Sequence, residues 1–142
     1  RENGEISLTH EEMTRFWITL DEGVNFALMG LEKMEGGEIF IPKIPSMKIL
    51  DMIKILATNC RIKNIGIRPG EKIHEILVTL EESRHAKEFE NYYVVIPNQT
   101  WWPQDKSIGG KSLPENFIYS SDKNELRLSQ EKIEKILNDF NS

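Results

Sequence analysis

The stretch from Gly66 to Glu75, with the sequence GIRPGEKIHE, constrains the fold of this chain more than any other. Alternating apolar residues over Ile62 to Ile67 predict a short strand that ends near the start of this stretch. Pro69 and Gly70 then require a turn, because proline fixes its own backbone and glycine tolerates tight-turn conformations. Proline also keeps the preceding residue, Arg68, extended. The chain must therefore leave a strand, turn sharply and present an arginine at that turn.

Arg68 and Glu71 flank this turn, and two interpretations of them are open. A guanidinium on a stiff turn can donate two charge-assisted hydrogen bonds to one phosphate group. The carboxylate of Glu71 can accept hydrogen bonds from sugar hydroxyls. The alternative is an ordinary surface turn whose charges are solvated or paired, since short motifs often occur by chance.

A second arginine, Arg15, lies inside the aromatic-rich run from Met13 to Ile18, for which we predict a strand. The run is typical of a buried strand from which the arginine reaches out to solvent. It also suits the wall of a pocket, in which rings pack on a ligand and the guanidinium meets an anion. Core packing is the more common role for such a run.

Capping residues and apolar spacing predict three helices. Thr19 and Glu22 form a capping box, and Gly36-Gly37 should end the helix that it opens. The predicted buried face of this helix consists of Val24, Ala27, Leu28, Leu31 and Met34. Ser46 is the predicted N-cap of a second helix, whose buried stripe would be Leu50, Ile53, Leu56 and Ala57. Ser129 should cap a terminal helix over 129–141, with Ile133, Ile136, Leu137 and Phe140 on its apolar face.

Further strands are predicted over 5–9, 38–41, 61–67 and 91–96. The spacing over 72–80 fits a strand or a helix equally, and 81–87 resembles a short exposed helix with solvated charges. Residues 98–128 lack periodicity and predict an irregular loop and tail. The adjacent Trp101 and Trp102 within it suit either docking onto another surface or burial in the same domain.

Length and composition limit the number of domains and the class of protein. A chain of 142 residues with a net charge of −5 predicts one domain and argues against a general nucleic-acid surface. No apolar run approaches the roughly 20 residues of a membrane span, and the single Cys60 is compatible with a reducing cytoplasm. The first methionine is Met13, so we expect a fragment, a processed product or a trimmed protein.

Several catalytic motifs are absent from the sequence. There is no GxGxxG fingerprint for a dinucleotide, and Gly110-Lys111-Ser112 lacks the earlier glycine of a P-loop. The three histidines have no metal-ligand spacing, and no tyrosine is followed four residues later by lysine. The sequence therefore holds no complete catalytic constellation.

Two motifs, MTRFWIT over 13–19 and GIRPGEKIHE over 66–75, resemble paired motifs in the C-terminal half of inverting UDP-N-acetylglucosamine 4,6-dehydratases. These enzymes belong to the extended short-chain dehydrogenase/reductase superfamily and act in bacterial surface and flagellar glycan synthesis. The segment 36–46, the residues 88–94 and the tail from Tyr119 to Asn124 are also similar to that family. The resemblance runs nearly end to end.

This resemblance implies a mixed α/β, C-terminal nucleotide-sugar-binding domain over 1–142, without the Rossmann half. It implies that Arg15 and Arg68 hold the diphosphate of a UDP-sugar and that Glu71 contacts the ribose. Trp17 would line the diphosphate pocket, with Met13 and Thr14 nearby.

The missing Rossmann half would bind NADP and carry the catalytic residues that eliminate water across C5–C6 and invert C5. The chain alone is therefore expected to be inactive, and the full-length enzyme is expected to be a cytoplasmic homo-oligomer. Two rivals share the motifs or the fold: a UDP-N-acetylglucosamine epimerase, and a binding or assembly module without enzymatic activity.

Overall fold

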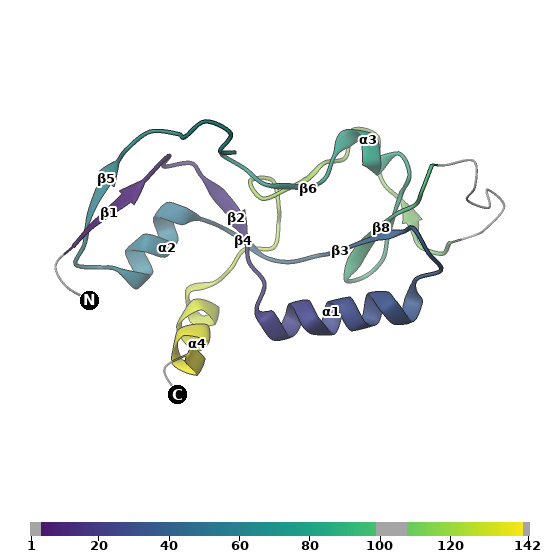
Figure 1. The fold of residues 1–142 in the computed structure, drawn as a ribbon, viewed down its shortest axis with the longest axis horizontal. Coiled ribbons are helices and arrows are strands. Elements are labelled where there is room, and N and C mark those ends of the chain that lie inside the picture. The colour runs from purple at the N-terminus through teal and green to yellow at the C-terminus, as the bar shows by residue number, and fades with distance from the viewer. Residues whose placement is uncertain (1–3, 99–107, 141–142) are drawn as a thin grey trace. The chain divides into compact units, whose positions relative to one another are not determined.

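The computed structural model describes the backbone of residues 4–98 and 108–140, and the side chains of these residues up to 135 (Figure 1). The described chain mixes helices and short strands, as the sequence predicts. It divides into two compact units, which are considered separately. Unit 1 comprises Arg1–Trp17, Pro45–Glu75 and Ser121–Ser142, and unit 2 comprises Ile18–Ile44 and Ile76–Ser120.

Unit 1 has two pairs of strands and two helices. Its elements are β1 (Glu5–Leu8), β2 (Thr14–Phe16), β4 (Ser46–Lys48), α2 (Ile49–Leu56), β5 (Arg61–Asn64) and α4 (Gln130–Phe140). Strand β1 pairs in parallel with β5, and β2 pairs antiparallel with β4. The prediction that β5 continues to Ile67 is wrong. The strand ends because the Asn64 side chain accepts a hydrogen bond from the Gly66 N–H at 3.1 Å, and Gly66 turns to φ +81°.

Ser46 is not the N-cap of α2, which corrects the sequence-based prediction. It lies in β4 opposite Phe16, and its hydroxyl donates to the Ser121 carbonyl at 2.7 Å instead of to a helix end. Helix α2 begins at Ile49, and no side chain caps it. Of its predicted stripe, Ile53 is buried, whereas Leu56 is 38% exposed.

Unit 2 is built on an antiparallel sheet with the strand order β3-β8-β7-β9, and on a separate β6–β10 pair. Its elements are α1 (Leu20–Lys33), β3 (Ile39–Pro42), β6 (Ile76–Val78), α3 (Leu80–Ser83), β7 (Ala86–Glu88), β8 (Tyr92–Val95), β9 (Lys111–Ser112) and β10 (Tyr119–Ser120). The undecided segment 72–80 therefore contains a strand. The helix predicted over 81–87 is only one turn, since its last two residues enter β7.

Aromatic rings pack on both faces of the sheet in unit 2, where Tyr93 and Tyr119 are buried and the other rings half-buried. Tyr92 stacks on Phe89 with ring centroids 4.7 Å apart, and Phe40 lies 5.9 Å from it. On the neighbouring residue of β8, the Tyr93 ring lies 5.1 Å from Tyr119 and 5.4 Å from Phe117. Successive strand residues point to opposite faces, so the two tyrosines anchor rings on both faces of the sheet.

Helix α1 begins at the predicted capping box, in which the hydroxyl of Thr19 accepts the Glu22 N–H and the Glu22 carboxylate accepts the Thr19 N–H. Its predicted buried face is wrong for this chain. The five residues of that face are all exposed, namely Val24, Ala27, Leu28, Leu31 and Met34. Figure 1 shows α1 running beneath β3. The buried Gly30, which is not one of those five residues, faces Phe40 of β3. A Cβ built on Gly30 would lie 3.9 Å from the Phe40 ring.

The C-terminal third is less irregular than its sequence predicts. Strands β9 and β10 lie within the span 98–128, whereas Trp101 and Trp102 lie outside the described residues. The predicted terminal helix is α4, and the hydroxyl of Ser129 caps it by accepting the Lys132 N–H at 3.2 Å. Ile133 is buried, while the side chains of Ile136, Leu137 and Phe140 are beyond the described ones. Among the described helices, none is long and apolar enough to cross a membrane.

Candidate functional site

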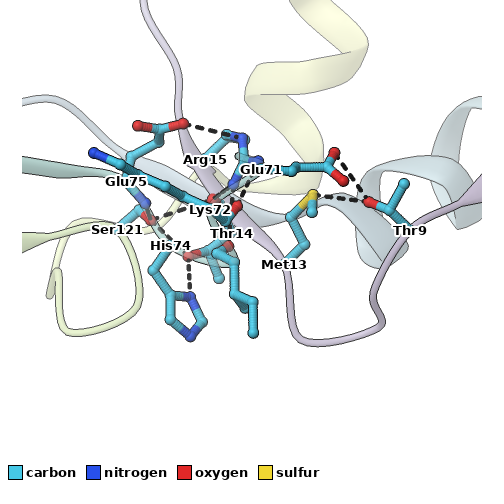
Figure 2. Close-up of polar contacts among 10 residues, drawn as sticks. Thr9, Met13, Thr14, Arg15, Glu71, Lys72, His74, Glu75 and Ser121 are labelled. Atoms are coloured by element: carbon cyan, nitrogen blue, oxygen red, sulfur yellow. Dashed lines mark hydrogen bonds and ion pairs between the residues drawn. The ribbon is translucent and has the colours of Figure 1, made fainter. Parts of the chain in front are cut away.

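The Arg68–Glu71 turn forms as its sequence predicts. The Glu71 N–H donates to the Arg68 carbonyl at 3.0 Å, and Gly70 has φ +81° after Pro69, which are the features of a type II turn. The Glu71 carboxylate also accepts the Arg68 N–H at 3.1 Å. It accepts the Thr9 hydroxyl at 3.1 Å as well (Figure 2). Glu71 thus closes the turn and ties it to the residue after β1.

The Arg15 guanidinium lies on the backbone that follows this turn. Its Nη1 donates to the carbonyls of Thr14 at 2.7 Å and Ile73 at 3.0 Å, and its Nη2 donates to that of Lys72 at 2.8 Å. Its Nε lies 3.3 Å from the Glu75 carboxylate. A guanidinium has five N–H donors, so these four contacts leave one donor on Nη2 uncommitted within the described part of the chain.

Arg68 differs sharply from Arg15. It is exposed, and its guanidinium has no hydrogen bond or ion pair among the described residues. Both arginines belong to unit 1, and the segment 72–75 joins them, since it follows the Arg68 turn directly and carries the Arg15 contacts. The segment that carries Arg15 is therefore bonded to the backbone that follows the Arg68 turn.

The segment 73–75 is held from both sides by backbone hydrogen bonds. The Thr14 N–H of β2 donates to the Ile73 carbonyl at 3.0 Å, and the Ser121 N–H donates to the Glu75 carbonyl at 2.9 Å. The Ser121 hydroxyl in turn accepts the Glu75 N–H at 2.9 Å. Ser121 therefore pairs with Glu75 like a strand residue and adds a side-chain bond.

A cluster of buried hydroxyls lies beneath this segment. Thr14 Oγ1 is 2.6 Å from Ser121 Oγ and 2.8 Å from His74 Nδ1, as the dashed lines of Figure 2 show. Thr14 is 2% exposed and Ser121 is completely buried. Ser46 Oγ and Arg127 Nη1 donate to the carbonyl of Ser121, at 2.7 Å and 3.2 Å. Every one of these groups has a partner, which favours one fixed arrangement.

Two other predicted site residues have buried groups: the whole side chain of Met13 and the indole N–H of Trp17. Met13 is 4% exposed, and its carbonyl accepts the Ile49 N–H. Trp17 is partly exposed, but its indole N–H is buried without a hydrogen-bond acceptor in the described regions. Buried unpaired donors are uncommon in proteins.

His74 also lines a cavity of about 490 Å³ in unit 1, together with charged residues of both signs. On this cavity, the Lys48 ammonium bonds Glu12 at 2.7 Å and holds the pKa of that carboxyl below its usual value, aided by its positive charge. No role was predicted from the sequence for His74, Ser121 or Arg127, and Ser46 was predicted only as a helix N-cap. Only the motif likeness around His74 and Ser121 pointed toward them.

Residues 1–97 match the model of a protein family described as "Polysaccharide biosynthesis protein". The chain belongs to this family. A UDP-N-acetylglucosamine 4,6-dehydratase (inverting) from Campylobacter jejuni subsp. jejuni serotype O:2 is 45% identical over 141 residues, covering 94% of this chain and 42% of that protein. The resemblance drawn from the motifs is thereby confirmed.

Other members of the comparison are more distant. A UDP-glucose 4-epimerase from Rickettsia bellii is 35% identical over 97 residues, covering 66% of this chain and 28% of that protein. The solved structure of Pen from Bacillus thuringiensis matches 98% of this chain and 41% of its own, with a TM-score of 0.77 and 27% identity. The chain thus spans about two fifths of the Campylobacter dehydratase and of the solved chain.

Proposed function

We propose that this chain is the UDP-sugar-binding part of an NADP-dependent UDP-N-acetylglucosamine 4,6-dehydratase that inverts C5, for bacterial surface or flagellar glycan synthesis. The observation that carries the proposal is the pairing of Arg15 with the Arg68 turn inside unit 1. Its 45% identity to the Campylobacter dehydratase supports the substrate class. The soluble enzyme would act in the cytoplasm as a homo-oligomer.

In this proposal Arg68 is the principal diphosphate ligand. Its guanidinium is exposed and uncommitted among the described residues, so it can bind an anion without losing an existing bond. Arg15 offers its remaining Nη2 donor and, because it grips the carbonyls of Lys72 and Ile73, also holds the turn in place. Charge-assisted contacts of this kind contribute roughly 1.5–3 kcal/mol each.

The remaining predicted residues would shape the site. Glu71 keeps lone pairs on its carboxylate for ribose hydroxyls, although both of its oxygens already accept one hydrogen bond. Trp17 would line the diphosphate pocket after a small rearrangement that exposes its buried indole N–H to the ligand. The buried Met13 and Thr14 would support β2 from behind and make no direct ligand contact.

The cofactor would be held by another part of the enzyme. This sequence has no glycine-rich dinucleotide fingerprint, so its residues do not fit NADP, and no step of the reaction is assigned to them. We therefore propose a Rossmann half as the partner of this chain, and turnover would require that half.

Exposed apolar side chains on α1 and β3 of unit 2 support the proposal of such a partner. The apolar stripe of α1 is exposed, with Val24 50%, Leu28 59% and Leu31 67% accessible, although the opposite side of the helix already packs on the sheet. A helix that is apolar on two sides requires a covering body on each. Strand β3 lies at the end of the described sheet order, with Ile39 54% exposed, and could pair with a further strand.

Calorimetric titration with UDP and UDP-N-acetylglucosamine tests the proposal directly. Arg68→Ala should weaken UDP binding about tenfold or more, because a charge-assisted contact to the diphosphate is lost. Arg84→Ala is the matched control, since Arg84 is also an exposed arginine but belongs to unit 2. Equal binding by wild type and Arg68→Ala would remove Arg68 from the site. No binding by the wild type would reject this chain as a sufficient UDP site.

The likeness to the Rickettsia epimerase over 97 residues favours a second candidate, a UDP-N-acetylglucosamine epimerase. The two activities differ in the mass of the sugar product, because a dehydratase removes one water and an epimerase conserves every atom. Mass spectrometry of UDP-N-acetylglucosamine incubated with the full-length protein would distinguish them. Proton NMR of the same sample then separates the two outcomes that conserve mass: an inverted sugar centre would indicate an epimerase, whereas unaltered UDP-N-acetylglucosamine would favour a non-catalytic binding or assembly module.

A further inference from the structure

The hydrogen bonds between His74, Thr14 and Ser121 indicate which ring nitrogen of His74 carries a hydrogen. Three contacts form a chain from this side chain: Nδ1 to Thr14 Oγ1 at 2.8 Å, Thr14 Oγ1 to Ser121 Oγ at 2.6 Å, and Ser121 Oγ to the Thr14 carbonyl at 3.2 Å. Each contact needs one hydrogen, and the two hydroxyls supply only two. The Glu75 N–H already donates to Ser121 Oγ and serves none of the three. When all three contacts are hydrogen bonds, the third hydrogen comes from the imidazole.

The complete arrangement has a defined direction. His74 Nδ1–H donates to Thr14 Oγ1, the Thr14 hydroxyl donates to Ser121 Oγ, and the Ser121 hydroxyl donates to the Thr14 carbonyl. If Nδ1 carried a lone pair instead, the 3.2 Å contact of Ser121 Oγ with the Thr14 carbonyl would lack a hydrogen, and that carbonyl would keep, among the described residues, only its bond from Arg15. Tautomers are assigned from networks of this kind, and this arrangement gives both hydroxyl hydrogens and both lone pairs of the Thr14 carbonyl a partner.

The chain of donors ends at the Arg15 site. The Thr14 carbonyl, its last acceptor, is also the acceptor of Arg15 Nη1 at 2.7 Å, so both of its lone pairs are used. Ser121 in turn holds Glu75 through its hydroxyl and its own N–H, and Glu75 is the ion-pair partner of Arg15 Nε. The orientation of the two hydroxyls therefore determines the placement of the segment on which the guanidinium rests.

We propose that His74 is a positioning residue of the UDP-sugar site: through the hydroxyls of Thr14 and Ser121, its Nδ1–H fixes the 73–75 segment and with it Arg15. The functional half of this inference rests on the proposed UDP-sugar binding. The structural half concerns the unliganded chain and can be tested without any ligand.

The tautomer is measured first. Two-bond ¹⁵N–¹H correlation spectra of the unliganded chain distinguish a neutral imidazole protonated at Nδ1 from one protonated at Nε2. Only His10, His74 and His85 contribute signals, and His74→Gln identifies the relevant set by its absence. We expect neutral His74 to carry its hydrogen on Nδ1. A hydrogen on Nε2 would overturn the proposal.

Two amide substitutions then separate the two ring nitrogens. The amide of Asn can occupy the place of Nδ1, whereas that of Gln reaches the place of Nε2. His74→Asn should therefore keep the Arg15 Nε–H resonance and UDP affinity within about twofold of wild type. His74→Gln and His74→Leu should shift or broaden that resonance and weaken UDP binding about three- to tenfold, the loss of one hydrogen bond. Arg15→Lys assigns the resonance.

The possible outcomes separate the two proposals. If the Gln variant retains the Arg15 resonance and affinity while the Asn variant loses them, His74 acts through Nε2 and the positioning role is refuted. If wild type does not bind UDP but the Arg15 resonance follows the Asn and Gln pattern, the UDP-site proposal fails and the positioning of Arg15 stands. An Arg15 resonance unchanged in all three variants refutes the positioning.

Discussion

Both units bury apolar side chains, but a hydrogen-bonded cluster of hydroxyls is found only in the described interior of unit 1. In unit 2 the buried residues are mainly apolar or aromatic, such as Val78, Tyr93 and Val94. In unit 1 three of the buried residues are the hydroxyl-bearing Thr14, Ser46 and Ser121, joined to one another by hydrogen bonds. Apolar packing is non-directional, whereas hydrogen bonds require specific angles. The candidate site belongs to the unit with the directional interior.

This difference is consistent with a UDP-sugar site in unit 1. A grip on a diphosphate needs donors placed to within a fraction of an ångström, and a fully paired polar network can provide that placement. An aromatic interior contributes more stability but tolerates small adjustments. Substitutions in unit 2 should therefore reduce stability most, and substitutions in the hydroxyl cluster should reduce binding out of proportion to stability.

The largest loss of stability is expected for Tyr93→Ala in unit 2. Its ring packs on Phe117 and Tyr119, and the Lys43 ammonium lies 4.9 Å from its centroid. Removing a buried ring of this size should lower the free energy of unfolding by about 3–5 kcal/mol. Urea denaturation followed by circular dichroism measures it, with the exposed Glu90→Ala as control. A loss as small as that of the control would show that aromatic packing does not dominate unit 2.

Ser121→Ala is the corresponding substitution in unit 1. It removes the acceptor of the Glu75 N–H and the partner of the Thr14 hydroxyl, so the free energy of unfolding should fall by about 1–3 kcal/mol. UDP affinity should fall as well, because Arg15 loses its support. Ser120→Ala is the control, since Ser120 is buried in unit 2, and its hydroxyl has no hydrogen bond among the described residues.

If the neighbouring serines gave equal losses in both stability and affinity, the contrast between the units would be unfounded. Both quantities come from the same protein samples, by urea denaturation and by calorimetric titration.

Local chemistry made part of this structure predictable. The Thr19–Glu22 capping box and the Pro69-Gly70 turn each depend on residues within three positions, and both are present as predicted. The Ser129 cap is local in the same sense. Arg68 could be singled out because the turn alone determines that it is exposed.

Long-range pairing was not predictable. Ser121 is 107 residues from Thr14 and 46 from Glu75, so no sequence spacing indicates that they meet. Ser46 was mispredicted for the same reason. It is a good capping residue by its local sequence, but its hydroxyl donates to the distant carbonyl of Ser121. The apolar stripe of α1 was recognised, but sequence periodicity does not say which body covers it, and in this chain none of the described residues bury it.

Tyr119→Phe probes a polar bond inside the aromatic unit. The phenol donates to the Ile44 carbonyl at 3.0 Å and accepts the Ile44 N–H at 2.9 Å. Losing both bonds should lower the free energy of unfolding by about 1–2 kcal/mol at neutral pH. Thermal unfolding of both proteins measures the difference, and no change would mean that packing alone holds this ring.

The bond between Tyr119 and Ile44 should also make the free energy of unfolding depend on pH. Burial raises the pKa of Tyr119 above its ordinary value near 10, with the bond to Ile44 opposing it. The unfolded phenol therefore loses its proton first, so Tyr119 stabilises the fold below about pH 10, and this stability is lost as pH rises toward the higher folded pKa. Wild type should lose stability above pH 10 more steeply than Tyr119→Phe.

The smallest expected effect is that of Thr19→Ala at the start of α1. Its hydroxyl accepts the Glu22 N–H at 3.2 Å in an exposed capping box, and loss of such a cap costs about 1 kcal/mol. Because this bond is local, the loss should appear as faster amide exchange in the first turn of α1, with the hydroxyl cluster of unit 1 unaffected. Thr19→Ser should restore the protection. Faster exchange at the Glu75 amide would show instead that a change in unit 2 reaches the hydroxyl cluster of unit 1. The two interiors would then unfold as one cooperative structure, and the contrast between them would not hold.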